Sequence, residues 1–115
     1  MKYINWSKHF PAAITVTDEK GIIIDMNDVS IAGYEKDGGA ALIGANMLDC
    51  HPEPSRSKAK KLYQEQKLNA YTITKHGKKK LIYQAPYFIE GRFAGMVEMS
   101  LPLPDEMPHF DRDKK

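Results

Sequence analysis

The chain has 115 residues, of which 42% are hydrophobic and 28% are charged, and its formal net charge is +2. This length suits one small domain, which can bury a single core but not two. The sequence contains no apolar run near the roughly 18–20 residues of a membrane span, and its first residues lack a signal-peptide core. Because a single cysteine cannot form an internal disulfide, we expect a protein of the reducing cytoplasm with no membrane partner.

Three aromatic residues at the N-terminus recur at helical spacing. Tyr3, Trp6 and Phe10 predict a short amphipathic helix or arm over residues 1–10, which Pro11 would end. A frayed terminus is the alternative, because so short a helix is marginal without packing. An exposed aromatic stripe favours association, so these three residues are the candidate contacts of a homodimer. We expect that dimer to use the open face of the predicted sheet as well.

The next segments predict a hairpin followed by a short helix. Residues 13–17 and 22–26 are rich in β-branched side chains and are separated by turn residues. Asn27 or Asp28 can cap a helix that Gly33 ends. These features place two paired strands and one helix in the first third of the chain.

The middle of the chain contains the longest predicted helix. Residues 35–41 form a weakly specified loop or turn of helix. After the proline-rich segment 50–54, a helix begins at Pro54 or Ser55 and extends to about Leu68. One stripe of it is expected to pack on the domain, namely Ala59, Leu62, Tyr63 and Gln66.

Three strands are expected in the last part of the chain. The first contains Tyr71 and Ile73, and a turn at residues 76–78 leads into a second strand over residues 81–89 that is broken at Pro86. Alternation in the last strand groups Phe93, Gly95, Val97, Met99 and Leu101 on one face and Glu98 with Ser100 on the other. The pattern therefore predicts an α+β fold, a five-stranded antiparallel sheet with helices packed on one face.

Several short motifs resemble the PAS sensor family. The second strand ends at Asn27, the short helix ends at the Gly-Tyr pair 33–34, and an Ile-Gly pair follows at residues 43–44. Two glycines at positions 91 and 95 are similar to the pair before the last PAS strand. The Asp-Cys-His-Pro segment 49–52 is similar to that of small stand-alone bacterial PAS sensors in which His-Pro precedes the long helix.

The resemblance implies a PAS domain over residues 11–103, followed by a flexible C-terminal tail over residues 104–115. PAS domains hold a small ligand or a protein partner between sheet and helices and usually catalyse no reaction. The resemblance therefore implies a stand-alone sensor or interaction module in signal transduction. The prolines at positions 102, 104 and 108 exclude a continuous output helix, so we expect the signal to pass to a separate signalling protein.

A ligand cavity is expected between the inner face of the sheet and the helices, where apolar walls meet a few polar groups. A fully packed core is the alternative, because close packing is the default interior. The candidate pocket residues are His51, Tyr34, Leu48, Tyr63, Tyr71, Ile73, Tyr83, Gln84, Val97 and Met99. Further candidate wall residues are Ile14, Val16, Ile24, Ile31 and Leu62.

The resemblance also bears on cofactors. Flavin-binding light sensors carry a Gly-x-Asn-Cys run, whereas here residues 44–46 are followed by Met47, so flavin photochemistry is not expected. A haem or other cofactor-carrying redox or gas sensor stays an alternative through His51, although one imidazole holds haem only inside a large apolar pocket.

The sequence offers little support for an enzyme or a nucleic-acid-binding protein. The Asp-Cys-His trio 49–51 invites a cysteine-dependent enzyme, but the side chains of sequence neighbours diverge, so we expect no catalytic site. His51 is more simply a hydrogen-bonding group and Cys50 a small apolar residue. We expect no metal site, because the histidines are scattered, at positions 9, 51, 76 and 109. The lysine clusters lack interleaved aromatic side chains and predict a solvated surface rather than a nucleic-acid site.

Overall fold

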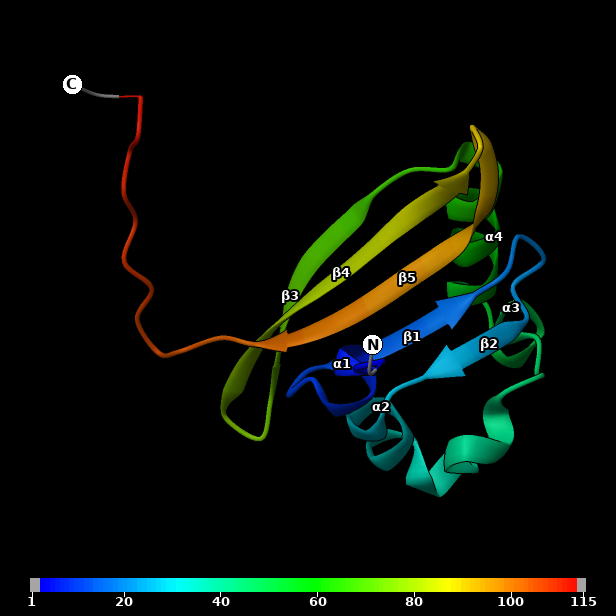
Figure 1. Cartoon of the computed structure of the whole chain (residues 1–115), viewed down its shortest axis with the longest axis horizontal. Coiled ribbons are helices and arrows are strands. Elements are labelled where there is room, and N and C mark those ends of the chain that lie inside the picture. The colour runs from blue at the N-terminus through cyan, green and yellow to red at the C-terminus, as the bar shows by residue number, and fades with distance from the viewer. Residues whose placement is uncertain (1–2, 114–115) are drawn as a thin grey trace.

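The computed structural model describes residues 3–113 and contains one five-stranded antiparallel sheet with helices along one face (Figure 1). Its strands, in spatial order, are β2 (Ile23–Met26), β1 (Ala13–Thr17), β5 (Arg92–Pro102), β4 (Lys78–Ile89) and β3 (Asn69–Lys75). The last strand of the chain therefore lies at the centre of the sheet and joins the first hairpin to the second. The predicted α+β architecture is confirmed.

The helices are short, apart from one. They are α1 (Trp6–His9), α2 (Asp28–Gly33), the 3₁₀ helices η1 (Glu35–Asp37) and η2 (Gly39–Leu42), α3 (Met47–Cys50) and α4 (Ser55–Glu65). The helix α4 ends before the predicted Leu68, because Gln66 adopts a left-handed conformation with φ 54° and its N–H caps the carbonyl of Leu62.

The strand β4 runs through Pro86 without a break, so the predicted interruption is wrong. Pro86 pairs with Met96 of β5, while the pairing with β3 stops at Gln84. Beyond Gln84, β4 therefore has a neighbouring strand on one side only. A proline lacks the N–H that a second neighbour would need, so it is tolerated at such an edge.

A β-bulge in β5 changes which residues face the helices. Tyr87 pairs with Gly95 but Phe88 pairs with Phe93, so Ala94 is an inserted residue. The ring of Phe93 lies 6.1 Å from that of Tyr63 on α4, on the helix side of the sheet. The predicted common face of Phe93 with Val97 and Met99 is therefore wrong, because simple alternation does not allow for an inserted residue.

Asn27 joins three segments at the β1 end of the molecule. Its side chain is only 4% exposed. The amide nitrogen donates hydrogen bonds to the carbonyls of Ser7 (2.9 Å) and Ala12 (2.7 Å), and the amide oxygen accepts from the N–H groups of Ile14 (2.9 Å) and Ser30 (3.0 Å). Asn27 thus caps α2, as predicted, and also fixes the segment between α1 and β1.

The two ends of the described chain lie apart (Figure 1). The residues after Pro102 leave the sheet as an extended segment, in which Met107 and Phe110 are exposed. Within residues 3–113, no helix is both long and apolar enough to cross a membrane.

Candidate ligand-binding site

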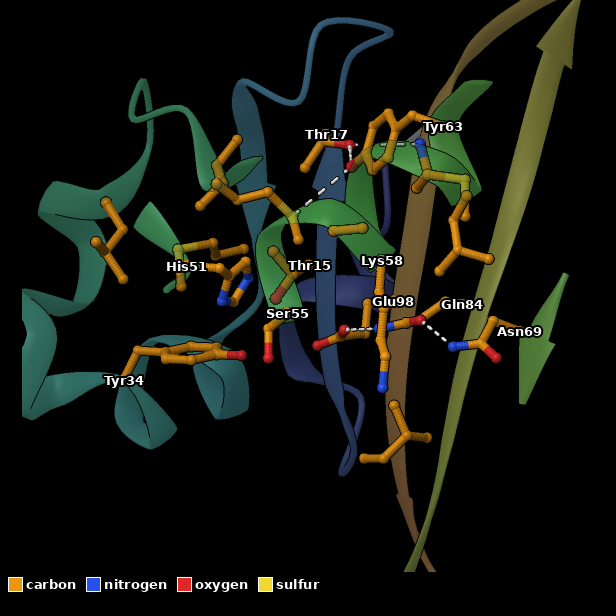
Figure 2. Close-up of a pocket in the computed structure, with 18 of the residues that line it drawn as sticks. Thr15, Thr17, Tyr34, His51, Ser55, Lys58, Tyr63, Asn69, Gln84 and Glu98 are labelled. Atoms are coloured by element: carbon orange, nitrogen blue, oxygen red, sulfur yellow. Dashed lines mark hydrogen bonds between the residues drawn. The ribbon is translucent and has the colours of Figure 1, made fainter. Parts of the chain in front are cut away.

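A cavity of about 1010 Å³ lies between the inner face of the sheet and the helices (Figure 2). Its apolar wall comprises Ile23, Met26, Leu42, Ala45, Met47, Ala59, Leu62, Ile73, Ile82 and Met96. Its polar residues are Thr15, Thr17, Tyr34, Asp37, His51, Ser55, Lys58, Tyr63, Asn69, Tyr71, Gln84 and Glu98. The volume is at the upper end of the roughly 300–1,000 Å³ that small-molecule sites occupy. The structure therefore has a cavity where a packed core was the alternative.

Three polar side chains from neighbouring strands form a continuous hydrogen-bonded row on the cavity wall (Figure 2). Asn69 of β3, Gln84 of β4 and Glu98 of β5 lie directly opposite one another in the sheet register. The Asn69 amide donates to Gln84 Oε1 (2.8 Å), and the Gln84 amide donates to Glu98 Oε2 (2.7 Å). We call this row the amide–carboxylate chain. Each amide donates a hydrogen bond to the next residue in the row, and the last acceptor is the Glu98 carboxylate.

Two tyrosines extend the polar part of the cavity. Tyr34 follows α2 and its hydroxyl points into the cavity (Figure 2), while Tyr71 projects from β3. Burial, and then the negative charge of Glu98, raise the pKa of both tyrosines, and Asp37 adds to the effect on Tyr34. Both phenols therefore stay protonated at neutral pH and can donate or accept hydrogen bonds.

At the other end of the cavity, Tyr63 connects the helices to the sheet. Its hydroxyl forms a hydrogen bond with Thr17 of β1 and a longer one, 3.6 Å, with the sulfur of Met47 on α3. The Thr17 hydroxyl in turn accepts the N–H of Met96 on β5. Burial is the main cause that raises the pKa of Tyr63. These contacts close the cavity where α4 approaches β1.

Six of the ten candidate pocket residues line the cavity, namely His51, Tyr34, Tyr63, Tyr71, Ile73 and Gln84, and so does Leu62. The structure does not place Leu48, Tyr83, Val97 or Met99 there. Leu48 borders a separate, smaller hollow beside Phe93. The further wall candidates Ile14, Val16, Ile24 and Ile31 also lie outside the lining.

Tyr83, Val97 and Met99 lie on the outer face of the sheet for a simple geometric reason. Successive residues of a strand point to opposite faces, and the cavity receives Gln84 and Glu98. Tyr83 and Met99 pair with each other, as do Ala85 and Val97, one position away from the cavity pair. The sequence reasoning assigned the more apolar face of β5 to the interior, whereas the structure turns the face with Glu98 inward.

Asn69, Lys58 and Glu98 line the cavity but are not among the residues predicted from the sequence. Asn69 was detectable, because a two-residue turn at His76-Gly77 sets the register that brings it opposite Gln84. Glu98 was not, because the bulge at Ala94 shifts the β4–β5 register by one residue. Lys58 and the other lysines of α4 look alike in sequence, and only the position on the helix separates them.

The structure describes the side chain of His51, on which the haem alternative depends, but not that of Cys50, on which the cysteine-dependent enzyme depends. His51 follows α3 and lines the cavity. The side chain of Cys50 lies outside the described part of the structure, so the cysteine-dependent alternative stays untested there. Over the described residues, no group of three or more His, Cys, Asp and Glu side chains could hold a metal ion.

The candidate dimer residues lie on the surface of the N-terminal segment. The exposed fractions are 85% for Tyr3, 61% for Trp6 and 36% for Phe10. The rings of Trp6 and Phe10 pack edge to face at 5.9 Å. An apolar surface is therefore present in the segment that Asn27 holds against the sheet.

No protein-family model matches the chain, and no curated protein sequence matches it either. Solved structures do match. A C-terminal domain from Streptococcus mutans shares 21% identity with a TM-score of 0.71, and the alignment covers 89% of this chain and 90% of that one. The Aer2 receptor of Vibrio cholerae, described as a dual PAS-heme oxygen sensor, shares 14% identity with a TM-score of 0.62 over 81% of this chain and 95% of that one.

The PAS domain of BvgS from Bordetella pertussis is similar as well. It shares 19% identity with a TM-score of 0.59, over 86% of this chain and 82% of that one. At such identities the likeness concerns the fold. The strand order, the Asn27 cap and these matches agree, and the chain has the PAS fold.

Proposed function

We propose that this protein is a sensor module that binds a small organic ligand in the cavity and passes its state to another protein. The cavity of about 1010 Å³ with the amide–carboxylate chain on its wall is the observation that carries the proposal. Apolar walls with a few fixed polar groups are typical of ligand sites. The PAS domains among the similar structures, which include a haem oxygen sensor, support a sensing role.

The arrangement of the hydroxyl groups favours binding over catalysis. A nucleophilic hydroxyl needs a base within hydrogen-bond reach. Thr15 instead forms a hydrogen bond with Ser30 at 2.6 Å, and Thr17 forms one with Tyr63. These hydroxyls satisfy structural partners. The two threonines of the wall thus support a binding role for the cavity. For the location we propose the cytoplasm, because the single cysteine suits a reducing compartment.

A haem sensor is the second candidate, and the position of His51 favours it. His51 lines the cavity, and an imidazole is a common axial ligand of haem iron. Haem also carries two propionates, which the carboxylates of Asp37 and Glu98 would repel inside the cavity. A visible absorption spectrum of the purified protein decides this point, because bound haem gives a Soret band that His51→Ala should remove.

Native mass spectrometry of the purified protein tests ligand binding directly. We expect a small-molecule adduct on the wild type and on Thr72→Trp, and its loss in Ile73→Trp. Ile73 lines the cavity, whereas Thr72 is exposed next to it on the same strand, and both side chains are β-branched, so Thr72→Trp is a matched control for the added bulk. An adduct that persists in Ile73→Trp, or a wild type that carries none, contradicts the proposal.

For the output we propose a homodimer through the aromatic N-terminal segment and the open outer face of the sheet, which contacts a separate signalling protein. Trp6 is 61% exposed, and this segment is linked to β1 and α2 through Asn27. Trp6→Glu should therefore lower the sedimentation mass to that of a monomer. Phe110→Glu, at a tail residue that is 67% exposed, is the matched control and should leave the dimer intact. An unchanged mass for Trp6→Glu contradicts the dimer.

A further inference from the structure

The amide–carboxylate chain leaves an acceptor facing the cavity. Oε2 of Glu98 receives the Gln84 amide, whose orientation is set because Asn69 donates to its oxygen. The amide–carboxylate chain thus supplies the Glu98 carboxylate with one hydrogen-bond donor, on the side that faces β3. In Figure 2 the Glu98 carboxylate and the Tyr34 hydroxyl point toward each other across the cavity. A ligand between them would meet a carboxylate oxygen and a neutral phenol.

The charges around this space are mainly negative. Glu98 and Asp37 both line the cavity, and the pKa of Tyr34 is raised by both carboxylates after the effect of burial. Among the described lining residues, Lys58 is the only lysine or arginine, and both it and Asp37 are exposed. An anion would therefore face two carboxylates and one ammonium group, whereas a cation would offset the excess negative charge.

The aromatic rings add a second feature that suits a cation. Tyr71 lies two residues from Asn69 on β3, and both line the cavity, as do Tyr34 and Glu98, so two phenol rings share the cavity with this carboxylate. Aromatic faces attract ammonium groups, and at rings that are 40% and 45% exposed this attraction is modest and adds to that of the carboxylate. Beyond them the wall is apolar, with Ile73 and Ile82 of the sheet opposite Leu62 of α4.

We infer that the ligand is a small organic cation, an ammonium or protonated nitrogen heterocycle on an apolar body, and that Glu98 binds its charge between Tyr34 and Tyr71. This inference rests on the proposed ligand-binding function and names the chemical class of the ligand. The apolar body lies against Ile73, Ile82 and Leu62, and the amide–carboxylate chain holds the carboxylate in place.

Three probes of the same shape test the charge preference, namely 2-phenylethylamine, 2-phenylethanol and 3-phenylpropionate. Titration of the ¹⁵N-labelled protein should shift the amide signals of Tyr34, Tyr71 and Glu98, with the amine binding at least about tenfold more tightly than the carboxylate. Glu98→Gln retains an oxygen for the Gln84 amide and should weaken the amine about tenfold or more, while leaving the alcohol unchanged.

One control variant and one variant of the lining separate the charge of Glu98 from general effects. Glu90→Gln, in the exposed β4–β5 turn, should bind all three probes like the wild type. Lys58→Met should bind the amine more tightly and the carboxylate more weakly than the wild type, because it removes the positive charge from the lining. Folding of each variant is checked by its own amide spectrum.

The outcomes distinguish this inference from the function on which it rests. If the alcohol or the carboxylate binds as tightly as the amine, or if Glu98→Gln binds the amine like the wild type, the cation inference is overturned while the cavity remains a ligand site. If no probe shifts the cavity amides, the cation inference also fails, and the native mass comparison of Ile73→Trp with Thr72→Trp still decides whether the cavity binds a ligand.

Discussion

The two halves of the sheet differ in how their polar groups are used. Around β1, β2 and α2, buried polar side chains such as Asn27, Thr17 and Ser30 are satisfied by the fold itself. On β3, β4 and β5, the polar groups of Asn69, Gln84 and Glu98 form a row that lines the cavity and ends on a carboxylate. The first half also contributes to the cavity wall, but its hydroxyls are occupied by structural partners, so it mainly supplies stability, whereas the second half offers polar groups to a ligand. Substitutions in the two halves should have correspondingly different effects.

The largest loss of stability is expected where β5 crosses β1. Gly95 has φ +145°, and a Cβ there would overlap the carbonyl oxygen of Thr17. Gly95→Ala should therefore cost more than about 4 kcal/mol of unfolding free energy or prevent folding, because the backbone of β1 must move. Urea denaturation measures it. Gly77→Ala, in a turn with open space around the glycine, should cost only about 1 kcal/mol, and equal losses would contradict the close approach.

Asn27→Ala should have the next largest effect. It removes a helix cap and leaves buried backbone groups of Ala12 and Ile14 without their partner, so we expect a loss of about 2–4 kcal/mol. Chemical denaturation of Asn46→Ala gives the comparison, because Asn46 caps the short α3 and otherwise makes one long, exposed hydrogen bond to the Lys20 carbonyl (3.4 Å), so its loss should cost about 1 kcal/mol. Similar losses for the two asparagines would show that Asn27 does not join the segments as described.

Tyr63→Phe should change the pH dependence of stability. Burial raises the pKa of Tyr63 in the folded state above the value near 10 of an unfolded chain. The stability that Tyr63 contributes through its raised pKa is therefore complete below pH ~10 and is lost as the pH rises through the pKa of the folded state. The variant should lose about 1 kcal/mol at pH 7 and decline less steeply above pH ~10 in denaturation experiments. Tyr3→Phe, at an exposed residue, should follow the wild type, and a parallel decline for Tyr63→Phe would contradict the argument.

The smallest effect on stability is expected at the cavity wall. Tyr71 is 45% exposed and lines the cavity, so Tyr71→Phe should change the unfolding free energy by less than about 0.5 kcal/mol. Thermal denaturation without added ligand tests this. A loss as large as that of Asn27→Ala would remove the distinction between the two halves.

The sequence predicted the strands, the long helix and the Asn27 cap because these depend on local patterns. β-branched runs, turn residues and capping side chains act over a few residues. The continuity of β4 through Pro86 depends instead on where β3 begins, which is a tertiary fact. Elements were therefore easier to predict than their edges.

The candidate site was predicted in part for the same reason. Tyr34, His51 and Gln84 were found as polar residues next to apolar segments. Glu98 was missed because the inserted residue Ala94 shifts the pairing of β5 with β4 by one position from the pairing that the β4–β5 turn alone would set. The preference for an apolar inner face was also misleading, because a binding cavity keeps polar groups inside.

The most direct test of the account is a fragment screen by ¹H–¹⁵N correlation spectroscopy with neutral, cationic and anionic fragments. We predict that the perturbed amides cluster around the cavity residues Tyr34, Tyr71 and Gln84, while those of the outer face of the sheet and of the N-terminal segment stay in place. Perturbations that gather instead on the outer face, around Tyr83 and Val97, or on the N-terminal segment, around Trp6, would contradict the claim that the cavity binds the ligand.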